Sequence, residues 1–163
     1  MARIYISIGS NIDAETRLRQ AVAALREQYG ALDLSSVYES EAVGFAGDNF
    51  LNLVVGLDTD EDVATVAATL RAIEDRYGRD RSVPRFSSRS IDLDLLLYDD
   101  LIRHGDGLEL PRDEITRNAF VLRPLAEIAP RLVHPELGKT MAGLWAAYDK
   151  SRQKLWPVPF EFV

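Results

Sequence analysis

The sequence predicts an α+β fold for residues 1–163: a ferredoxin-like βαββαβ core with an additional C-terminal strand and helices, all in a single domain. Two observations support this class. Apolar residues alternate with a period of two in some segments and recur at helical spacing in others. The order of these segments is strand, helix, strand, strand, helix, strand, which is the split βαβ arrangement. With 47% hydrophobic residues, the chain can bury one substantial core.

The first strand and the first helix have clear local patterns. Alternation of apolar residues over 4–8 predicts a strand, and Gly9-Ser10-Asn11 interrupts that pattern. Asp13 is placed to cap the helix that follows, and Gly30 is placed to end it. The apolar stripe of this helix comprises Leu18, Ala21, Val22, Leu25 and Tyr29.

The next segments complete the βαββαβ order. Residues 34–38 and 50–57 predict two strands, and the loop between them is longer than a tight hairpin needs. A second helix is expected to begin near Thr59, where Thr59 and Asp62 resemble a capping box, and to end at Gly78. The apolar stripe of the second helix comprises Val63, Val66, Ala67, Leu70, Ile73 and Tyr77.

The last third of the chain is less regular. Residues 108–111 predict a short strand, and a helical segment is expected from about Thr116. Pro124 must start, kink or end part of that segment because proline cannot donate a backbone hydrogen bond. Thr140 is placed to cap a final helix. The apolar tail, residues 155–163, contains two prolines and is expected to be extended.

The composition excludes several kinds of site. No cysteine occurs, so disulfide bonds, thiolate zinc sites and cysteine nucleophiles are excluded. The two histidines, His104 and His134, are too few for a histidine-rich metal centre, and we expect both to be structural or exposed. No apolar run has the length of a signal peptide or a membrane span. We therefore expect a cytoplasmic protein without a membrane partner.

Charge and motifs also limit the function. A net charge of −7 argues against general nucleic-acid binding, because such proteins are usually basic. Neither a P-loop motif nor a G-x-G-x-x-G motif occurs, so the sequence supports neither a Walker-type ATPase nor a Rossmann dehydrogenase. The sequence gives no prediction of the oligomeric state.

A pair of carboxylates lies in the predicted strand that covers residues 91–98. Asp92 and Asp94 are two residues apart, so both point to the same face. Two like charges side by side in an apolar strand are unfavourable unless a cation lies between them. Oxygen ligands suit a hard ion, and Mg²⁺ is the natural candidate when phosphates complete the coordination shell.

The alternative to a metal site is an exposed edge strand with a polar face. Leu96 and Tyr98 are expected to continue the face of the two aspartates as apolar residues, which argues against a solvated face. Leu93, Leu95 and Leu97 are expected on the opposite face. We therefore favour the metal site.

Positive charge is concentrated just before this strand. The cluster comprises Arg76, Arg79, Arg81, Arg85 and Arg89. Cations are favoured at a helix C-terminus, which explains Arg76 and Arg79 but not Arg85 and Arg89, which follow the helix. Guanidinium groups bind phosphate oxygens bidentately. Arginines that lead directly into a two-carboxylate strand therefore indicate a site where a polyphosphate and its metal meet.

The motifs around these residues resemble those of the hydroxymethyl-dihydropterin pyrophosphokinases, from the opening strand to the region of Pro124. The matching segments are Ile8-Gly9-Ser10-Asn11, Phe50-Leu51-Asn52, Arg79-x-Arg81, Arg85-Phe86-Ser87-Ser88-Arg89-Ser90-Ile91-Asp92-Leu93-Asp94-Leu95, Leu110-Pro111 and Phe120-Val121-Leu122-Arg123-Pro124-Leu125. Each motif alone is weak, but their order and spacing together are specific.

The resemblance implies a folate-pathway enzyme that transfers pyrophosphate from ATP to the hydroxymethyl group of 6-hydroxymethyl-7,8-dihydropterin and releases AMP. It implies two Mg²⁺ ions, held by Asp92 and Asp94. The catalytic residues that it implies are Arg79, Arg89, Asp92 and Asp94. The residues implied to bind ATP or its phosphates are Glu74, Arg79, Arg81, Arg85, Arg89, Leu95 and Arg112. The residues implied to bind the pterin are Ser40, Val43, Phe50, Asn52 and Phe120.

The sequence differs from the typical family pattern in three places. It has Phe86-Ser87-Ser88 where members have a tryptophan followed by Gly-Pro, and Pro111-Arg112 where they have Pro-His. It has Glu41-Ala42-Val43-Gly44 where members carry a proline-rich stretch. Arg112 can contact a phosphate as a cation, but it cannot replace a titrating imidazole. The alternatives are therefore a paralogue that acts on another pterin, a pterin- or nucleotide-binding protein with little turnover, and, least favoured, a ferredoxin-like RNA-binding domain.

Overall fold

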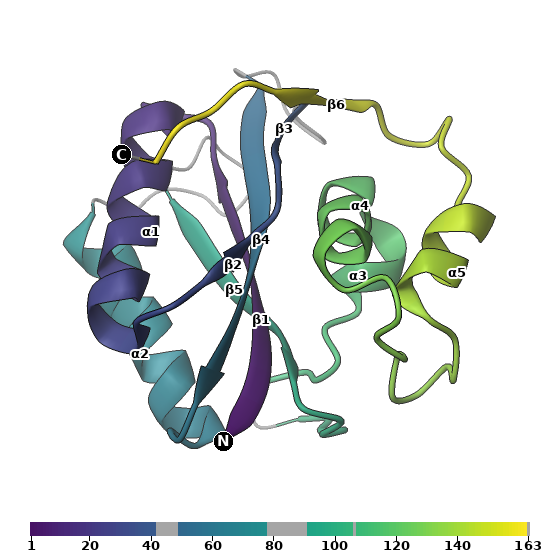
Figure 1. The fold of residues 1–163 in the computed structure, drawn as a ribbon, viewed down its shortest axis with the longest axis horizontal. Coiled ribbons are helices and arrows are strands. Elements are labelled where there is room, and N and C mark those ends of the chain that lie inside the picture. Colours follow the sequence, from purple (N-terminus) through teal and green to yellow (C-terminus); the bar gives the residue numbers. More distant parts are fainter. Residues whose placement is uncertain (42–48, 78–90, 106, 163) are drawn as a thin grey trace.

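One antiparallel sheet forms the middle layer of the molecule, with helices on both of its faces (Figure 1). The computed structural model describes residues 1–41, 49–77, 91–105 and 107–162. The strands are β1 (Ala2–Ser10), β2 (Asp33–Leu34), β3 (Val37–Ser40), β4 (Phe50–Thr59), β5 (Asp92–Tyr98) and β6 (Leu155–Val158). The helices are α1 (Ala14–Tyr29), α2 (Val63–Arg76), α3 (Glu114–Arg117), α4 (Ala119–Ile128) and α5 (Met141–Ala147).

The strand order is β5-β1-β4-β3-β6, with β2 also paired to β4, so β1 and β4 lie at the centre. Helices α1 and α2 cover one face, and α3, α4 and α5 lie on the other side (Figure 1). This arrangement confirms the predicted α+β fold with an additional C-terminal strand and helices. None of the described helices is both long and apolar enough to cross a membrane.

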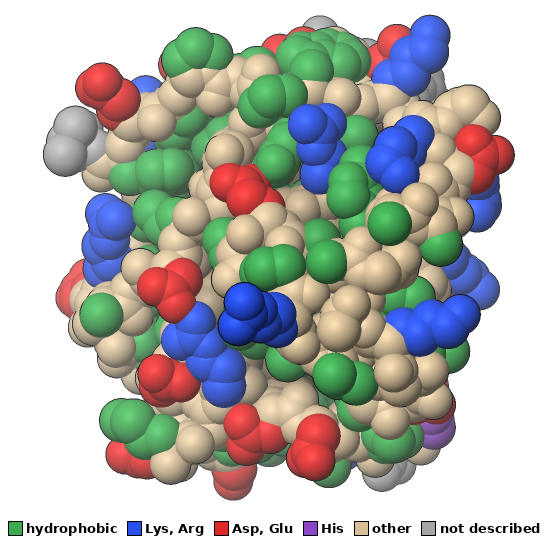
Figure 2. Space-filling view, turned by 45° about the vertical axis from the view of Figure 1, so that its right-hand side comes forward, with side chains coloured by type: hydrophobic (Ala, Val, Ile, Leu, Met, Phe, Trp, Pro, Cys, Tyr) green, Lys and Arg blue, Asp and Glu red, His purple; other side chains and the backbone are tan. Residues whose placement is uncertain are grey.

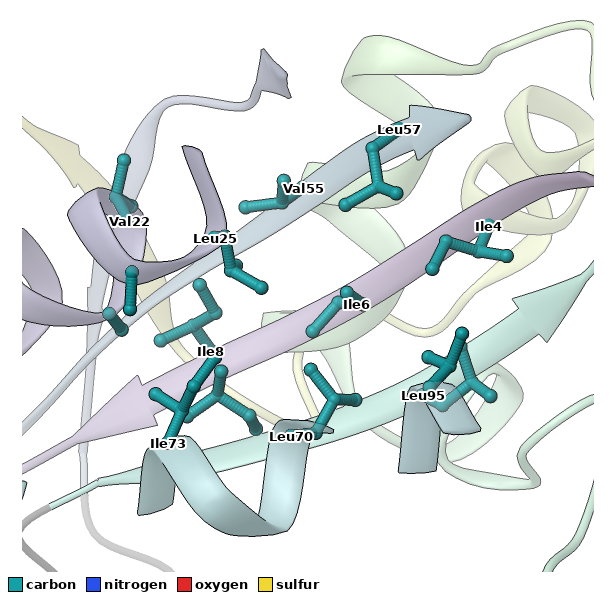
Figure 3. Close-up of a cluster of buried hydrophobic side chains, with 14 of the residues drawn as sticks. Ile4, Ile6, Ile8, Val22, Leu25, Val55, Leu57, Leu70, Ile73 and Leu95 are labelled. Atoms are coloured by element: carbon teal, nitrogen blue, oxygen red, sulfur yellow. The ribbon is translucent and has the colours of Figure 1, made fainter. Parts of the chain in front are cut away.

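The period-two pattern of β1 buries a core between the sheet and the first two helices. Ile4, Ile6 and Ile8 are fully buried, and Leu25 of α1 and Leu70 of α2 pack into the same cluster (Figure 3). Each large aliphatic side chain buried in this way contributes about 1.5–3 kcal/mol. The opposite face of the sheet is also buried, beneath α4 and α5. The sheet is therefore held rigidly from both sides.

Of the two predicted helix starts, the one at Asp13 is confirmed in position but lacks the side-chain cap, and the one near Thr59 is wrong. Asp13 precedes α1, but it has a φ of 53° and its side chain makes no capping hydrogen bond. Thr59 is the last residue of β4, and α2 begins only at Val63, where the Asp62 side chain accepts a 2.8 Å hydrogen bond from the amide of Thr65. The predicted end of α1 at Gly30 is confirmed, since its φ of 79° suits a residue without Cβ.

The predicted strand 34–38 is divided into β2 and β3. At Ser35 the amide donates to the carbonyl of Val54 (3.0 Å), while the Ser35 hydroxyl accepts from the amide of Val54 (2.9 Å). A side chain thus replaces one backbone group of the ladder. Both short strands still pair with β4, so the topology is unchanged.

The C-terminal third differs from the prediction in detail. Leu110 forms only an isolated bridge with Arg103 instead of a strand over 108–111. Two helices, α3 and α4, replace the single predicted segment, and Pro124 lies inside α4. The cap at Thr140 is confirmed, because its hydroxyl accepts from the amide of Gly143 at 3.1 Å. The tail is extended as predicted, and β6 pairs with β3.

Candidate functional site

The predicted site residues gather at one end of the sheet, on the face that α4 covers. In the strand register, Tyr38 of β3 pairs with Asn52 of β4, Asn52 pairs with Gly9 of β1, and Gly9 pairs with Asp92 of β5. Residues directly opposite each other on neighbouring strands point to the same face. Antiparallel pairing therefore brings Asn52 and Asp92, which are far apart in sequence, to either side of Gly9.

A β-bulge in β5 decides which side chains share the face of the two aspartates. Asp94 pairs with Ser7 and Asp92 with Gly9, but the register shifts between the partners of Ile6 and Tyr5. Leu96 and Leu97 consequently both pack in the cluster under α4. An extra residue in one strand changes the alternation beyond it. Asp92 and Asp94 are half-buried and project together as predicted.

Because of the bulge, the predicted side-chain orientations of Leu97 and Tyr98 are wrong. Leu97 was expected opposite the aspartates, yet it packs on their face with Tyr5, its partner in β1. Tyr98 was expected on their face, yet it packs against the α1 and α2 core, and its hydroxyl donates to the carbonyl of Glu61 at 2.6 Å. Leu96 lies on the predicted face. No sequence signal marks the bulge, because all of these residues are apolar or aromatic.

Glu74 of α2 supports the aspartate strand from the side. It is only 5% exposed, and its carboxylate accepts a 2.9 Å hydrogen bond from the amide of Leu93, the residue between Asp92 and Asp94. In the sheet formed by the described residues, β5 is the last strand, so no further strand there pairs with this amide. Glu74 thereby fixes the backbone from which both carboxylates project.

Arg112 lies beside Asp94. Its guanidinium is 3.5 Å from the Asp94 carboxylate and 2.9 Å from that of Glu114, and its amide donates to the carbonyl of Leu96. Burial alone would lower the pKa of Arg112, but the charges of Asp94 and Glu114 raise it above its usual value. Burial raises the pKa of Glu114, and the charge of Asp94 adds to that effect while Arg112 opposes it. Arg112 thus remains a cation at the aspartate pair.

The residues predicted to bind a pterin lie across Gly9 from the aspartates. The Asn52 amide donates to the Ser40 hydroxyl at 2.8 Å, and both side chains are buried. A Cβ on Gly9 would lie 2.8 Å from the Asn52 side-chain oxygen, so glycine allows Asn52 to lie over β1. Phe50 is two residues from Asn52 on the same face, and Phe120 of α4 packs against the cluster on that face. Both rings are half-buried.

The remaining predicted residues do not join this group. The Leu95 side chain is 4% exposed and packs in the α1 and α2 core, so only its backbone can contact a nucleotide. That backbone lies in the strand at the end of the sheet. The predicted residues outside the described part of the chain are Val43, Arg79, Arg81, Arg85 and Arg89.

Three residues of the site were not predicted. Glu114 pairs with Arg112, Ser7 lies opposite Asp94 in the register, and Gly9 leaves room for Asn52. The sequence held a signal for Gly9, since a glycine at the end of a strand often marks a close approach. Ser7 could have been found from the alternation of β1. Glu114 could not, because it depends on how the chain turns after Pro111.

The donors at this end of the sheet suit a metal that keeps other ligands. Among the described residues, no group of three or more His, Cys, Asp or Glu side chains is placed to hold a metal. Within the described ranges, the carboxylates of Asp92 and Asp94 project to a common face. Mg²⁺ is usually bound by one or two carboxylates together with phosphates and water. The aspartate pair therefore fits Mg²⁺ bound together with a polyphosphate.

Comparisons with known proteins agree with this arrangement. The model of the 7,8-dihydro-6-hydroxymethylpterin-pyrophosphokinase (HPPK) family matches residues 5–130. The 2-amino-4-hydroxy-6-hydroxymethyldihydropteridine pyrophosphokinase of Bacillus subtilis is 39% identical over 133 residues, which are 78% of each chain. The Aquifex aeolicus protein of the same name is 33% identical over 137 residues, 83% of this chain and 85% of that protein. The folic acid synthesis protein fol1 of Schizosaccharomyces pombe is 34% identical over 135 residues, 80% of this chain and 18% of that protein.

Solved structures share the fold. The crystal structure of Plasmodium falciparum HPPK-DHPS wild type superposes with a TM-score of 0.70 at 14% identity. It covers 89% of this chain, and the match spans 44% of that longer chain. A second structure of the same protein, with pterin and p-hydroxybenzoate, gives a TM-score of 0.74 at 15% identity over 93% of this chain and 43% of that one.

Proposed function

The chain belongs to the 7,8-dihydro-6-hydroxymethylpterin-pyrophosphokinase family, and we propose that it transfers pyrophosphate from ATP to 6-hydroxymethyl-7,8-dihydropterin, releasing AMP, in folate biosynthesis. The observation that supports this most is the register row at the end of the sheet. It sets a polar pair, Asn52 and Ser40, on one side of Gly9 and the carboxylates of Asp92 and Asp94 on the other. A pterin and a polyphosphate can therefore meet over β1.

The pterin binds between β3, β4 and α4. A pterin is a flat heterocycle with a polar edge, so its recognition requires aromatic faces and hydrogen-bonding groups. Phe50 and Phe120 supply the aromatic faces, while Asn52, oriented by Ser40, reads the polar edge. Val43 is a further proposed contact, on the basis of the family resemblance alone.

The nucleotide binds on the β5 side. Asp92 and Asp94 hold two Mg²⁺ ions together with the phosphates, and the reaction is accordingly Mg²⁺-dependent. When bound, Mg²⁺ neutralises the charge of the phosphates during transfer. The Leu95 backbone, in the strand at the end of the sheet, is a further proposed contact to the nucleotide. Glu74 contributes indirectly, because its carboxylate accepts the hydrogen bond of the Leu93 amide and so holds the backbone of β5 in place.

Arginines hold the phosphates. Arg79 and Arg89 are the proposed catalytic cations, and Arg81 and Arg85 are further phosphate ligands; all four lie in the sequence between α2 and β5, outside the described residues. Within the described part of the chain, Arg112 is the guanidinium found beside Asp94. Guanidinium groups suit this role because they remain charged and bind phosphate oxygens in pairs.

The reaction is a direct transfer. The pterin hydroxymethyl oxygen forms a bond to the β-phosphorus of ATP and loses its proton, while the bond from that phosphorus to the α,β-bridging oxygen breaks and AMP leaves. No covalent enzyme intermediate is required. The protein contributes alignment and charge neutralisation, which together account for most of the catalysis in such transfers. The reaction takes place in the cytoplasm, where ATP and Mg²⁺ are available.

The proposal is tested by measuring AMP released from ATP and Mg²⁺, with and without 6-hydroxymethyl-7,8-dihydropterin. We expect AMP to form only with the pterin. Other pterin alcohols, tested in parallel, examine the substrate preference. AMP formation that is fastest with another pterin alcohol, or the absence of AMP despite bound ATP, would contradict the proposal.

The metal assignment predicts the effect of removing a carboxylate. Asp92→Asn and Asp94→Asn should each lower kcat by about 10²-fold or more, because charge neutralisation at the phosphates is lost. Both variants should remain folded, since the two side chains are half-buried on the sheet surface. Circular dichroism and Mn²⁺ binding, followed by electron paramagnetic resonance, complete the test. Unchanged Mn²⁺ affinity in both variants would refute the assignment.

A further inference from the structure

The C-terminal segment, residues 149–158, contacts two elements that flank the proposed pterin site, α4 and β3. Its first contact is through Gln153. The Gln153 side-chain oxygen accepts a 2.8 Å hydrogen bond from the amide of Ala119, and its side-chain nitrogen donates to the Asn118 side-chain oxygen at 2.9 Å. Asn118 precedes α4 and Ala119 is its first residue, immediately before Phe120. One side chain thus holds the start of the helix that carries the aromatic wall.

The second contact follows after only two residues. Leu155 pairs with Ser40 in the ladder between β6 and β3, and Val158 pairs with Val37. Two residues of extended chain span at most about 7 Å, so little slack remains between the Gln153 backbone and this ladder. The position of the end of β3 therefore depends on the position of the start of α4.

Other contacts join α4 to Ser36, just before β3, and to Tyr38 within β3. Glu127 of α4 accepts hydrogen bonds from the Ser36 amide and hydroxyl and from the Tyr38 hydroxyl, at 2.7–3.1 Å. Arg123 of α4 lies over the Tyr38 ring at 4.9 Å. These residues fix α4 against the middle of β3. At the end that carries Ser40 and Phe120, the link that the described residues show is the C-terminal segment.

We propose that Gln153 is a positioning residue for the pterin, which sets the separation of Phe120 from Ser40 and Asn52 through the C-terminal segment. This inference rests on the proposed function and extends it to a part of the chain that follows the family match, which ends at residue 130. The glutamine side chain suits the role because both of its polar groups are used, one as an acceptor and one as a donor. The aspartate side of the site lies across β1 and is not touched by this segment.

The test compares Gln153→Met with the wild type. Methionine has a similar length and volume but makes neither hydrogen bond. We expect the KM for the pterin to rise about fivefold to tenfold, a change of about 1–1.4 kcal/mol in binding free energy, because Phe120 is held less firmly. The KM for ATP should stay within about twofold, because the Gln153 side chain bonds the start of α4 and not β5, which carries the aspartates. The dissociation constant of the pterin, measured by its fluorescence, should rise in parallel.

Two further variants make the result specific. Gln153→Glu keeps the acceptor for the Ala119 amide at a helix N-terminus, where a negative charge is favourable, so it should recover most of the pterin affinity. Lys154→Ala, at an exposed neighbouring position, should behave as the wild type. Amide hydrogen exchange at Ala119, which does not depend on activity, should be faster in Gln153→Met only.

These experiments distinguish a failure of the proposed function from a failure of the role proposed for Gln153. A wild type that forms no AMP with the pterin contradicts the proposed function. An active wild type for which Gln153→Met leaves the pterin KM unchanged, or raises both KM values equally, overturns the role of Gln153. A urea unfolding midpoint for Gln153→Met near that of the wild type shows that the KM change reflects positioning.

Discussion

Single residues at the end of the sheet have roles that their sequence neighbours do not reveal. Gly9 is a strand residue, yet it matters because Asn52 lies over it. Arg112 follows a proline in the sequence, yet it lies beside Asp94 on another element. The aspartates and the asparagine could be predicted from spacing and family resemblance. Glu114, the partner of Arg112, could not, because its position depends on the three-dimensional path of the chain.

Gly9→Ala tests the close approach of Asn52 to β1. The new Cβ would lie 2.8 Å from the Asn52 side-chain oxygen, so Asn52 must move and its hydrogen bond to Ser40 should break. We expect the pterin KM to rise about tenfold, since a buried hydrogen-bonding group is displaced. The ATP KM should change little. Steady-state kinetics with each substrate varied in turn provide the measurement, and an unchanged pterin KM would show that Asn52 does not contact the pterin.

Arg112 and Glu114 should stabilise each other. Arg112→Met leaves the half-buried Glu114 without its cation and should lower the free energy of unfolding by about 1–2 kcal/mol. Glu114→Gln alone should cost about 1 kcal/mol or less, because Arg112 retains Asp94. The double variant should be about as stable as Arg112→Met alone. A double-mutant cycle from urea unfolding measures the coupling, and strict additivity would contradict it.

The secondary-structure elements were mostly predictable, and the exceptions have identifiable causes. The strand and helix order followed from apolar periodicity, because β1, α1, β4 and α2 bury long stripes. The division of β2 from β3 was missed because a serine hydroxyl replaces a backbone group there. The bulge in β5 was missed because a run of leucines fits either face. Periodicity predicts elements but not their irregularities.

Glu74 links two elements, and its removal should affect both stability and transfer. Glu74→Ala leaves the buried amide of Leu93 without this acceptor, which should lower the free energy of unfolding by about 1–3 kcal/mol. Glu74→Gln keeps an acceptor oxygen and should cost less. Because Leu93 lies between the aspartates, kcat should fall more in the alanine variant than in the glutamine variant. Equal stability and equal kcat in the two variants would show that the hydrogen bond does not support β5.

At the scale of the whole molecule, negative charge predominates, although arginines are concentrated in the sequence just before β5. The net charge is −7, and the side of the molecule shown in Figure 2 has cationic, acidic and apolar side chains interspersed. Under the proposed function, the attraction for an anionic substrate would therefore come from these arginines and from Mg²⁺ rather than from the overall field. The net charge alone argued against a general nucleic-acid binder. ATP was indicated only by the spacing of the arginines and aspartates and by the family resemblance.

His104 is exposed and His134 is buried, which fits the expectation that both are exposed or structural. The two side chains should make the free energy of unfolding depend on pH in opposite directions. Hydrogen bonds to Glu109 and Glu136 raise the pKa of His104 above 6.5, so its stabilisation is complete below pH 6.5 and is lost as the pH rises. Burial lowers the pKa of His134, whose ring nitrogen accepts from two amides, so its stabilisation is lost as the pH falls below 6.5.

Replacing His104 should separate these effects. His104→Gln should be less stable than the wild type at pH 5 and nearly as stable at pH 9, because only protonated His104 bonds both carboxylates. Urea unfolding at several pH values gives the difference in free energy of unfolding. A difference that does not depend on pH would show that the ion pairs of this exposed side chain contribute nothing measurable.

The most direct measurement uses ATP labelled with ³²P in its γ-phosphate. The protein is mixed with this ATP, Mg²⁺ and 6-hydroxymethyl-7,8-dihydropterin, and the products that carry the label are identified. Intact pyrophosphate transfer predicts that the label appears on the pterin in the same amount as AMP is formed. Label found as free phosphate together with ADP, or AMP formed without labelled pterin, would contradict the account.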